Sequence, residues 1–158
     1  MAERIAIVSD HAAFEMKAEL VRYLGGLGHE VLDLGTASAD SVDYPDFGYL
    51  LAAAIASGRA EKGIALCGSG IGISIAVNRH PACRCALVSE SVSARLAREH
   101  NDANVLALGA RLIGIEQATE CVSVFLATPF GANPETRGRH QRRVDKLSHP
   151  AFDTQEPA

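Results

Sequence analysis

The sequence has no tryptophan, few aromatic residues and no long apolar run. Aromatic residues make up 5% of its 158 residues, and no stretch approaches the ~18 consecutive apolar residues that a membrane-spanning helix needs. Met1-Ala-Glu-Arg4 leads directly into a strand pattern, without the apolar segment of a signal peptide. We therefore expect a cytoplasmic protein that does not enter a membrane.

Cysteine is also scarce, and its spacing excludes two further classes of protein. The four cysteines form neither the paired CxxC motifs of a zinc site nor the dense pattern of a disulfide scaffold. Cys83, Cys85 and Cys121 fall within strand or helix patterns and are interpreted as core thiols. Cys67 instead stands at the end of an apolar run, beside a glycine-rich turn.

The balance of charge argues against a protein that binds nucleic acid through its bulk charge. Fifteen basic and 19 acidic side chains give a net charge of −4 at pH 7. The segment Arg137–Arg143 departs from this balance, since it holds four arginines and a histidine. A solvated basic helix face is one interpretation. Basic residues crowded into one segment of an acidic chain, however, favour an anionic ligand such as phosphate.

Short apolar runs alternate with helical patterns along the chain. The predicted strands cover residues 4–9, 29–34, 64–66, 84–88 and 105–108. Helical patterns begin near Ala12, Tyr44, Ile73, Ser91 and Ile115, and a last helix is expected at about 137–147. This alternation predicts a parallel sheet with helices on both faces, a three-layer α/β/α Rossmann-like sandwich. We expect one domain over residues 1–147 and a flexible tail at 148–158.

The strongest functional signal is a strand–turn–helix pattern in the middle of the chain. Ile64–Leu66 predicts a buried strand, Cys67 follows it, and Gly68, Gly70 and Gly72 lead into an apolar helix pattern. Backbone N–H groups of such a turn converge on an anion, where the helix dipole adds partial positive charge. A cysteine at a helix N-terminus is favoured as a thiolate. The pattern therefore indicates a nucleophile or base beside an anion site.

Three known phosphate-binding loops do not fit this turn. Its G-x-G-x-G spacing lacks the last glycine of a dinucleotide fingerprint, and no Lys-Ser/Thr pair follows as in a P-loop. A Cys-x5-Arg phosphatase loop would need arginine where Ile73 stands. A plain packing turn and an inert buried thiol are the alternatives that stay open.

Other polar residues are expected at the carboxyl ends of the strands. Asp10 and His11 follow the first strand, Arg111 follows the fifth, and His100 and Asn101 follow a helix. Ligands of open parallel sheets bind beyond the carboxyl ends of the strands. We therefore expect these residues to gather at one edge with the glycine turn. The alternative for Asp10 is a cap on the first helix.

Five motifs occur in an order that resembles a known family. They are Ser9-Asp-His11, Cys67-Gly-Ser-Gly-Ile-Gly-Ile-Ser74, Arg98-Glu-His-Asn-Asp-Ala-Asn104, Gly109-Ala-Arg111 and Gly138-Arg-His-Gln-Arg-Arg143. Over residues 4–147 they resemble the B-type ribose-5-phosphate isomerases, a family that also includes galactose-6-phosphate and allose-6-phosphate isomerases. The family fold is an α/β/α sandwich around a five-stranded parallel sheet, in agreement with the alternation of strands and helices.

The resemblance implies that a phosphorylated aldose is isomerised to a ketose through a cis-enediolate, without a metal or other cofactor. Ribose 5-phosphate and ribulose 5-phosphate are the expected pair. By similarity, Cys67 is the catalytic base, and Ser69 relays protons between the sugar oxygens. His100, with Asp10, would open the furanose ring. Members without this cysteine use a glutamate at the position of Ile73, so the chain resembles the cysteine-dependent branch.

The resemblance also implies how the sugar is held. Five successive backbone N–H groups would bind the enediolate oxygens: those of Gly68, Ser69, Gly70, Ile71 and Gly72. Basic side chains would hold the phosphate, namely His11, Arg111, Arg139 and Arg143, with His140 assisting. Asn101 would bind sugar hydroxyls. In the family the C-terminal arginines reach the neighbouring subunit's site, which implies a homodimer or a dimer of dimers with shared active sites.

Two alternatives stay open. The same chemistry could act on tetrose 4-phosphate, allose 6-phosphate or galactose 6-phosphate, because the sequence does not reveal the depth of the pocket. A non-catalytic phosphosugar-binding protein could be built on the same scaffold, although Cys67 and His100 are both present. Compared with shorter members, the chain is several residues longer around Ala132–Thr136, just before the last helix.

Overall fold

A computed structural model describes residues 2–152 and confirms the predicted sandwich. Its five strands are all parallel and lie in the order β2-β1-β3-β5-β4. Their bounds are Arg4–Ser9 for β1, Glu30–Asp33 for β2, Lys62–Cys67 for β3, Cys85–Leu87 for β4 and Val105–Gly109 for β5. The chain leaves β1 towards one edge of the sheet and β3 towards the other. The strand order therefore switches direction between these two strands.

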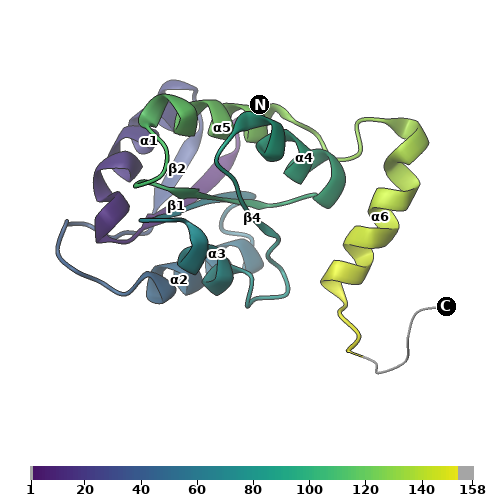
Figure 1. Ribbon diagram of the computed structural model, residues 1–158, viewed down its shortest axis with the longest axis horizontal. Helices are drawn as coiled ribbons and strands as arrows, with labels where there is room; N and C mark the ends of the chain where they lie inside the picture. The colour runs from purple at the N-terminus through teal and green to yellow at the C-terminus, as the bar shows by residue number, and fades with distance from the viewer. Residues whose placement is uncertain (1, 153–158) are drawn as a thin grey trace.

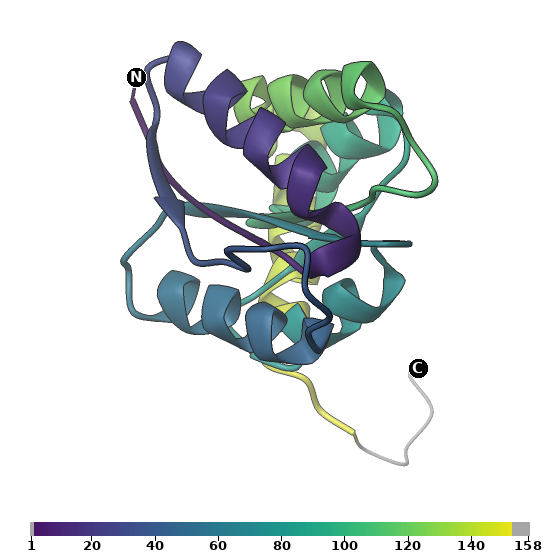
Figure 2. The same cartoon turned by 90° about the vertical axis from the view of Figure 1, so that its left-hand side faces the viewer.

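Helices cover both faces of the sheet (Figures 1 and 2). One face carries the 3-10 turn η1 (His11–Ala13), α1 (Phe14–Gly26), α4 (Ser91–Asn101) and α5 (Ile115–Ala127). The other face carries α2 (Tyr44–Ala56) and α3 (Ile71–Val77). Within residues 2–152, no helix is long and apolar enough to cross a membrane.

The central strand β3 is buried on both sides because each side packs against a layer of helices. Ile64 and Leu66 contribute to the core beneath α1, α4 and α5. The alternate residues Ala65 and Cys67 contribute to the core beneath α2 and α3. The side chain of Cys67 therefore leaves the sheet on the face that carries the start of α3.

Side-chain caps begin several helices. Asp10 Oδ1 accepts hydrogen bonds from the N–H groups of Ala12 and Ala13, at 3.0 and 3.3 Å. The interpretation of Asp10 as a helix cap is therefore correct for one of its oxygens. Glu90 and Asn133 accept N–H groups in the same way at the starts of α4 and α6.

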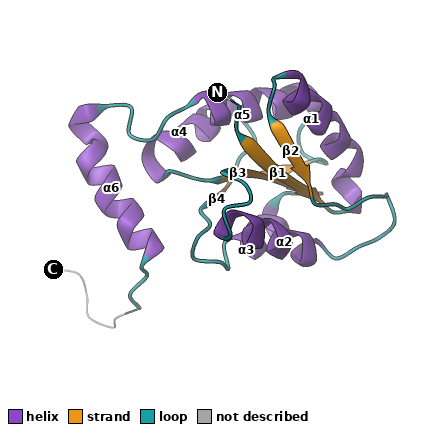
Figure 3. Ribbon diagram, turned by 180° about the vertical axis from the view of Figure 1, so that it is seen from behind, coloured by secondary structure: helices purple, strands orange, loops and turns teal. Residues whose placement is uncertain are grey.

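The last helix, α6, stands apart from the sandwich (Figures 1 and 3). It spans Pro134–Ser148, so it begins earlier than the predicted residue 137, and its buried side chains are His140 and Val144. It packs against α4. That this helix extends to a partner subunit stays a prediction. Residues 153–158 of the expected tail lie outside the described residues.

The loop before α6 is tied to α4 by backbone oxygens. Arg98 Nε donates to the carbonyl oxygen of Thr128 at 3.3 Å. The N–H of Gly131 donates to the carbonyl oxygen of Glu99 at 3.1 Å. These bonds determine where α6 begins, at the C-terminal part of α4.

The ammonium group of Lys17 is buried, but the carboxylate that pairs with it is half exposed. Lys17 on α1 is 3% exposed, and its Nζ lies 2.6 Å from Oδ1 of Asp33, whose side chain is 41% exposed at the end of β2. The same oxygen accepts the N–H of Gly35 at 3.0 Å. This carboxylate therefore joins α1 to the turn after β2.

Because the two side chains are buried to different extents, removing one should lower the free energy of unfolding more than removing the other. Asp33→Asn leaves the Lys17 ammonium buried without a counter-charge, so the free energy of unfolding should fall by about 3 kcal/mol. Lys17→Met leaves the Asp33 carboxylate in contact with water, and a fall of about 1 kcal/mol or less is expected. Urea denaturation of both variants measures the two values. Equal losses would contradict the assignment of the burial cost to Lys17.

Candidate active site

The carboxyl end of β3 is held by both neighbouring strands. Beyond the regular ladder, the N–H of Asp10 donates to the carbonyl oxygen of Leu66 at 3.1 Å. On the other side, the N–H of Arg111 donates to the carbonyl oxygen of Gly68 at 2.9 Å. The residues that follow β1 and β5 therefore lie on either side of Cys67.

The glycine turn folds back onto Cys67. Gly70 has φ 75°, a left-handed conformation that glycine adopts without steric cost, and its N–H donates to Cys67 Sγ at 3.1 Å. Ser69 Oγ accepts the N–H of Ile71 at 3.2 Å. Two of the five predicted oxyanion donors are thus already paired, one with the sulfur and one with the serine. The Ser69 hydroxyl keeps its own proton to donate.

The turn packs directly on the backbone of β5. A Cβ added at Gly109 would lie 2.5 Å from the carbonyl oxygen of Ser69, and one at Gly70 would lie 2.8 Å from the carbonyl carbon of Leu108. Both distances are too short for a side chain. The close approach that holds the turn above Cys67 therefore depends on glycine at both positions.

Seven of the predicted site residues meet around one cavity of about 520 Å³. They are Asp10, Cys67, Gly68, Ser69, Ile71, Gly72 and Arg111. The guanidinium group of Arg111 lies against Gly68, with Nη1 3.2 Å from the place where a Cβ would stand. The cavity joins a thiol, a carboxyl group, a hydroxyl group and a guanidinium group. The guanidinium group in particular suits an anionic ligand.

Tyr44 completes the wall of this cavity and was not among the predicted site residues. Its ring lies over Gly72, where an added Cβ would stand 2.5 Å from Tyr44 Cζ. The sequence contained an indirect signal, because a glycine in the first turn of a helix is a poor helix former and suggests a group packed close to it. The sequence did not indicate that this group comes from the start of α2.

His11 is turned towards the loop that follows β2. Its Nδ1 accepts the N–H of Val42 at 3.2 Å, so Nε2 carries the proton when the ring is neutral. His11 follows Asp10 directly but is not among the residues that line the cavity. Its contact with phosphate stays a prediction.

His100 and Asn101 do not lie at this edge of the sheet, so the expectation that all the polar groups gather there is wrong. They end α4, which runs back from β4 to the start of β5. Asn104 follows closely and accepts the N–H of Gly63 at 2.9 Å, near the start of β3, whereas Cys67 ends that strand. A helix between two parallel strands must return from the carboxyl edge to the amino edge. Its last residues therefore face away from the site.

A second cavity, of about 270 Å³, contains His100 and His140. Their rings are stacked, 10° from parallel, with centroids 4.4 Å apart. Burial lowers the pKa of His140, and the nearby His100, Arg139 and Arg143 lower it further against the opposing effect of Glu99. Both arginines are exposed on α6. Within one chain, the two histidines and the cavity around Cys67 are therefore separate.

The other three cysteines lie away from the cavity around Cys67. Burial raises the pKa of Cys83 to about 11, and it raises the pKa of Cys85 and Cys121 as well. Cys83 and Cys121 are buried as predicted, whereas Cys85 is partly exposed. Cys83 and Cys85 line a cavity of about 440 Å³ together with Asn101. These thiols are poor candidates for the base because burial disfavours their thiolates.

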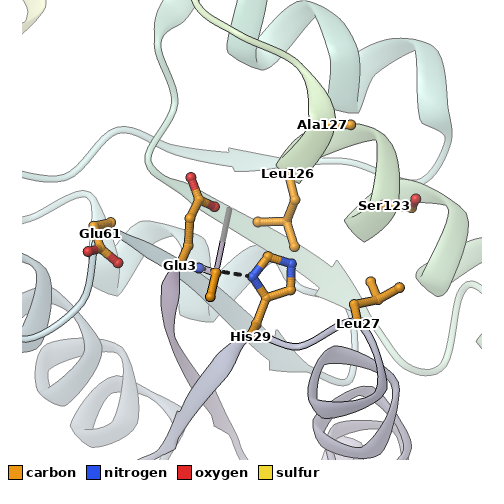
Figure 4. Close-up of a pocket in the computed structure, with 8 residues that line it drawn as sticks. Glu3, Leu27, His29, Glu61, Ser123, Leu126 and Ala127 are labelled. Atoms are coloured by element: carbon orange, nitrogen blue, oxygen red, sulfur yellow. Dashed lines mark hydrogen bonds between the residues drawn. The ribbon is translucent and has the colours of Figure 1, made fainter.

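A larger cavity, of about 930 Å³, lies at the amino ends of β1 and β2 (Figure 4). His29 Nδ1 accepts the N–H of Glu3 at 3.3 Å there, and the Glu3 carboxylate pairs with Lys62 at 2.8 Å. Its lining includes none of the predicted site residues. We therefore assign the candidate site to the cavity around Cys67, where the reactive groups converge.

Comparison with known proteins leads to the family that the five motifs resemble. A sequence model of the Ribose/Galactose Isomerase family matches residues 5–147. The chain belongs to this family. The match includes Asp10, the glycine turn and nearly all of α6, so it covers the cavity around Cys67 and the cavity of His100 and His140. As a ribose/galactose isomerase family member, the protein is an isomerase enzyme.

Individual relatives agree with this assignment over nearly their whole length. Ribose-5-phosphate isomerase B of Escherichia coli (strain K12) is 42% identical over 146 residues, which are 92% of this chain and 95% of the relative. The crystal structure of a ribose 5-phosphate isomerase from Thermotoga maritima has a TM-score of 0.88 and 49% identity, and the match covers 94% of this chain and 99% of that one. Ribose-5-phosphate isomerase B of Clostridium thermocellum has a TM-score of 0.87 and 45% identity, with 92% and 95% covered.

The lowered pKa of His140 predicts that acid weakens the docking of α6 on this isomerase. The docked ring binds a proton less readily than an undocked one, whose pKa is about 6.5. The contribution of the neutral ring to docking is therefore fully present above pH 6.5, and it decreases as the pH falls through that value towards the lowered pKa.

Amide hydrogen exchange in α6, corrected for the intrinsic rate, should be faster at about pH 5.5 than at about pH 7.5. His140→Phe serves as the control, because it keeps a flat ring that does not titrate, and it should remove most of this dependence. Protection of α6 that does not change with pH in the wild type would contradict the assignment.

Proposed function

We propose that this isomerase interconverts ribose 5-phosphate and ribulose 5-phosphate through a cis-enediolate, with Cys67 as the base. The observation that carries the proposal is the cavity in which Cys67 Sγ meets the glycine turn, with Ser69 and Arg111 around it. Relatives named ribose-5-phosphate isomerase B, at 42% and 38% identity, support the choice of sugar.

The reaction moves one proton from C2 to C1 and another from O2 to O1. Cys67, as a thiolate, takes the C2 proton, the electrons of that bond form a C1=C2 double bond, and O1 becomes negatively charged. Ser69 relays the O2 proton to O1. Cys67 then returns its proton to C1 as O2 becomes the carbonyl oxygen. Backbone N–H groups of the turn would stabilise the negative charge, an effect of about 3–4 kcal/mol for one donor in other enzymes.

Phosphate binding and ring opening need groups that one chain does not bring to this cavity. Arg111 lines it, but Arg139 and Arg143 lie on the exposed side of α6, and His100 lines a different cavity from Cys67. A single chain therefore cannot present all of these groups to one sugar. We infer that a second copy supplies those on α4 and α6, in a homodimer or a dimer of dimers with shared active sites.

The surface around the cavity supports an interface with that second copy. Ile71, Ile75 and Leu112 line the cavity and are 51%, 59% and 67% exposed. An apolar cluster of this kind is typical of a surface that another protein covers. α6 stands away from the body of its own chain (Figure 3), which leaves its arginines free to contact a neighbour.

A comparison of sugars separates this proposal from the alternatives. We expect a kcat/KM of at least ~10⁴ M⁻¹s⁻¹ for ribose 5-phosphate, above the values for allose 6-phosphate, galactose 6-phosphate and a tetrose 4-phosphate. Preference for another of these sugars would change the substrate and leave the chemistry in place. Binding without turnover of any of them would favour a non-catalytic phosphosugar-binding protein.

Cys67→Ala should remove nearly all isomerase activity, because the proposed mechanism moves the C2 proton through this thiol. Loss of a proton-transfer group costs about 10²–10⁴-fold in rate, and the folded protein should still bind the phosphosugar. Cys121→Ala is the matched control, since it removes a buried thiol that lies in the core on the other face of the sheet and does not line the cavity. Activity of Cys67→Ala within about threefold of the wild type, well short of that range, would mean that Cys67 is not the base.

Mixing two inactive variants tests the shared site. Cys67→Ala and His100→Ala each lack one required group, so each should be nearly inactive alone. When the two are unfolded and refolded together, about half of the dimers are mixed, and one of the two sites in each mixed dimer regains both groups. Activity should therefore recover to about a quarter of the wild-type value.

The control for this mixture is Cys67→Ala refolded with the Cys67→Ala/His100→Ala double variant. Both chains then lack the thiol, so no site regains it and no activity should return. If the first mixture also stays inactive while its dimers form, the two groups do not act from different subunits.

A further inference from the structure

Among the described residues, two of the six histidines have rings that no hydrogen bond holds. In the other four, Nδ1 is within hydrogen-bonding distance of a backbone group: His11, His29, His80 and His149. Within residues 2–152, no hydrogen bond reaches a ring nitrogen of His100 or His140. A histidine that transfers protons is ordinarily oriented by a hydrogen bond to one of its nitrogens. Within its own chain, His100 is therefore oriented in another way.

The stack between the two rings provides this orientation. The centroids are 4.4 Å apart and the planes differ by 10°, at the short end of the centroid separations of roughly 4.5–7 Å that are typical of aromatic pairs. His140 is only 5% exposed, whereas His100 is exposed to solvent. The pair therefore consists of a buried ring that acts as a platform and an exposed ring that lies on it.

The position of His140 is fixed by contacts of residues before it and after it in the sequence. Asn133 caps the start of α6, and the N–H of Gly131 donates to the carbonyl oxygen of Glu99 at 3.1 Å, one residue before His100. Val144, one turn after His140, is the other buried side chain of α6. His140 therefore cannot move far unless α6 leaves α4.

We propose that His140 is a positioning residue for His100: its buried ring holds the exposed imidazole in the orientation needed to open the furanose ring of the sugar. The inference rests on the proposed function, which assigns ring opening to His100. In that step the O1–H proton passes to a base, the C1–O4 bond breaks as the C1=O1 carbonyl forms, and O4 takes a proton from an acid. Stacking suits this task because it leaves both nitrogens of His100 free for proton transfer.

This role differs from the phosphate contact that the family resemblance implies for His140. Arg139 and Arg143 are exposed on α6 and can meet a phosphate, but His140 lies beneath His100. Loss of a phosphate ligand weakens the binding of every phosphosugar and raises KM. Loss of a positioning residue lowers the turnover only of sugars whose ring must first be opened.

Three variants and two sugars distinguish the roles. His140→Ala removes the stack, His140→Phe keeps a flat ring without nitrogens, and His149→Ala is a control near the end of the same helix. Ribose 5-phosphate closes into a furanose. Erythrose 4-phosphate cannot, because its O4 carries the phosphate, so it needs no ring opening. The measured quantities are kcat and KM of each variant with each sugar, with circular dichroism to verify that α6 stays folded.

We expect His140→Ala to lower kcat for ribose 5-phosphate roughly 10–100-fold with little change in KM. The ratio of kcat/KM for ribose 5-phosphate to that for erythrose 4-phosphate should fall about as much. His140→Phe should retain most of the ribose 5-phosphate activity, and His149→Ala should retain all of it. An equal loss on both sugars would overturn the proposal. So would an effect of His140→Phe as large as that of His140→Ala, because His140 would then act through its nitrogens.

NMR relaxation of the His100 ring gives a readout that does not depend on turnover. The ring should become mobile on the nanosecond timescale in His140→Ala and stay ordered in His140→Phe. A ring that is as ordered in His140→Ala as in the wild type would overturn the proposal, even if erythrose 4-phosphate is not a substrate. If the wild type is inactive on every phosphosugar, the proposed function fails, and the ring-opening role of the pair fails with it whatever the relaxation shows.

Discussion

The hydrogen bonds that continue past the end of β3 are the constraint on which the candidate site depends. Asp10 is bonded to the backbone of Leu66 from one side, and Arg111 to the backbone of Gly68 from the other. Because these bonds join backbone groups, they bring a carboxyl group and a guanidinium group to the thiol of Cys67 through strand pairing alone. The site therefore forms where the strand order switches direction, as is general for open parallel sheets.

The same sheet explains why one chain holds an incomplete set of groups. α4 must return to the amino edge before β5 can pair in parallel with β3, and this carries His100 away from Cys67. α6 then follows α4 and brings His140 beneath His100. The chain builds two rigid parts of a site at different places on its surface. The proposed pairing of two copies would bring the parts together without a change in the fold of either.

Residues that stand directly at strand ends could be placed from the sequence. Asp10, Cys67 and Arg111 each follow an apolar run, and the boundaries of those runs were sufficient to predict that they converge. Tyr44 and His100 could not be placed in this way. Tyr44 reaches the cavity because α2 packs beside α3, and the position of His100 depends on the direction in which α4 crosses the sheet. Neither packing nor direction is encoded in the residues next to them.

The sequence by itself determined the sandwich of helices around a parallel sheet, the glycine turn after Cys67 and the family. It did so because apolar periodicity and glycine spacing act between neighbours in the chain. Only the tertiary structure decided that Tyr44 walls the cavity, that His100 lies on another side of the chain, and that the ring of His140 stacks on it. These are contacts between elements far apart in sequence, and their geometry follows from how whole helices pack rather than from any local pattern.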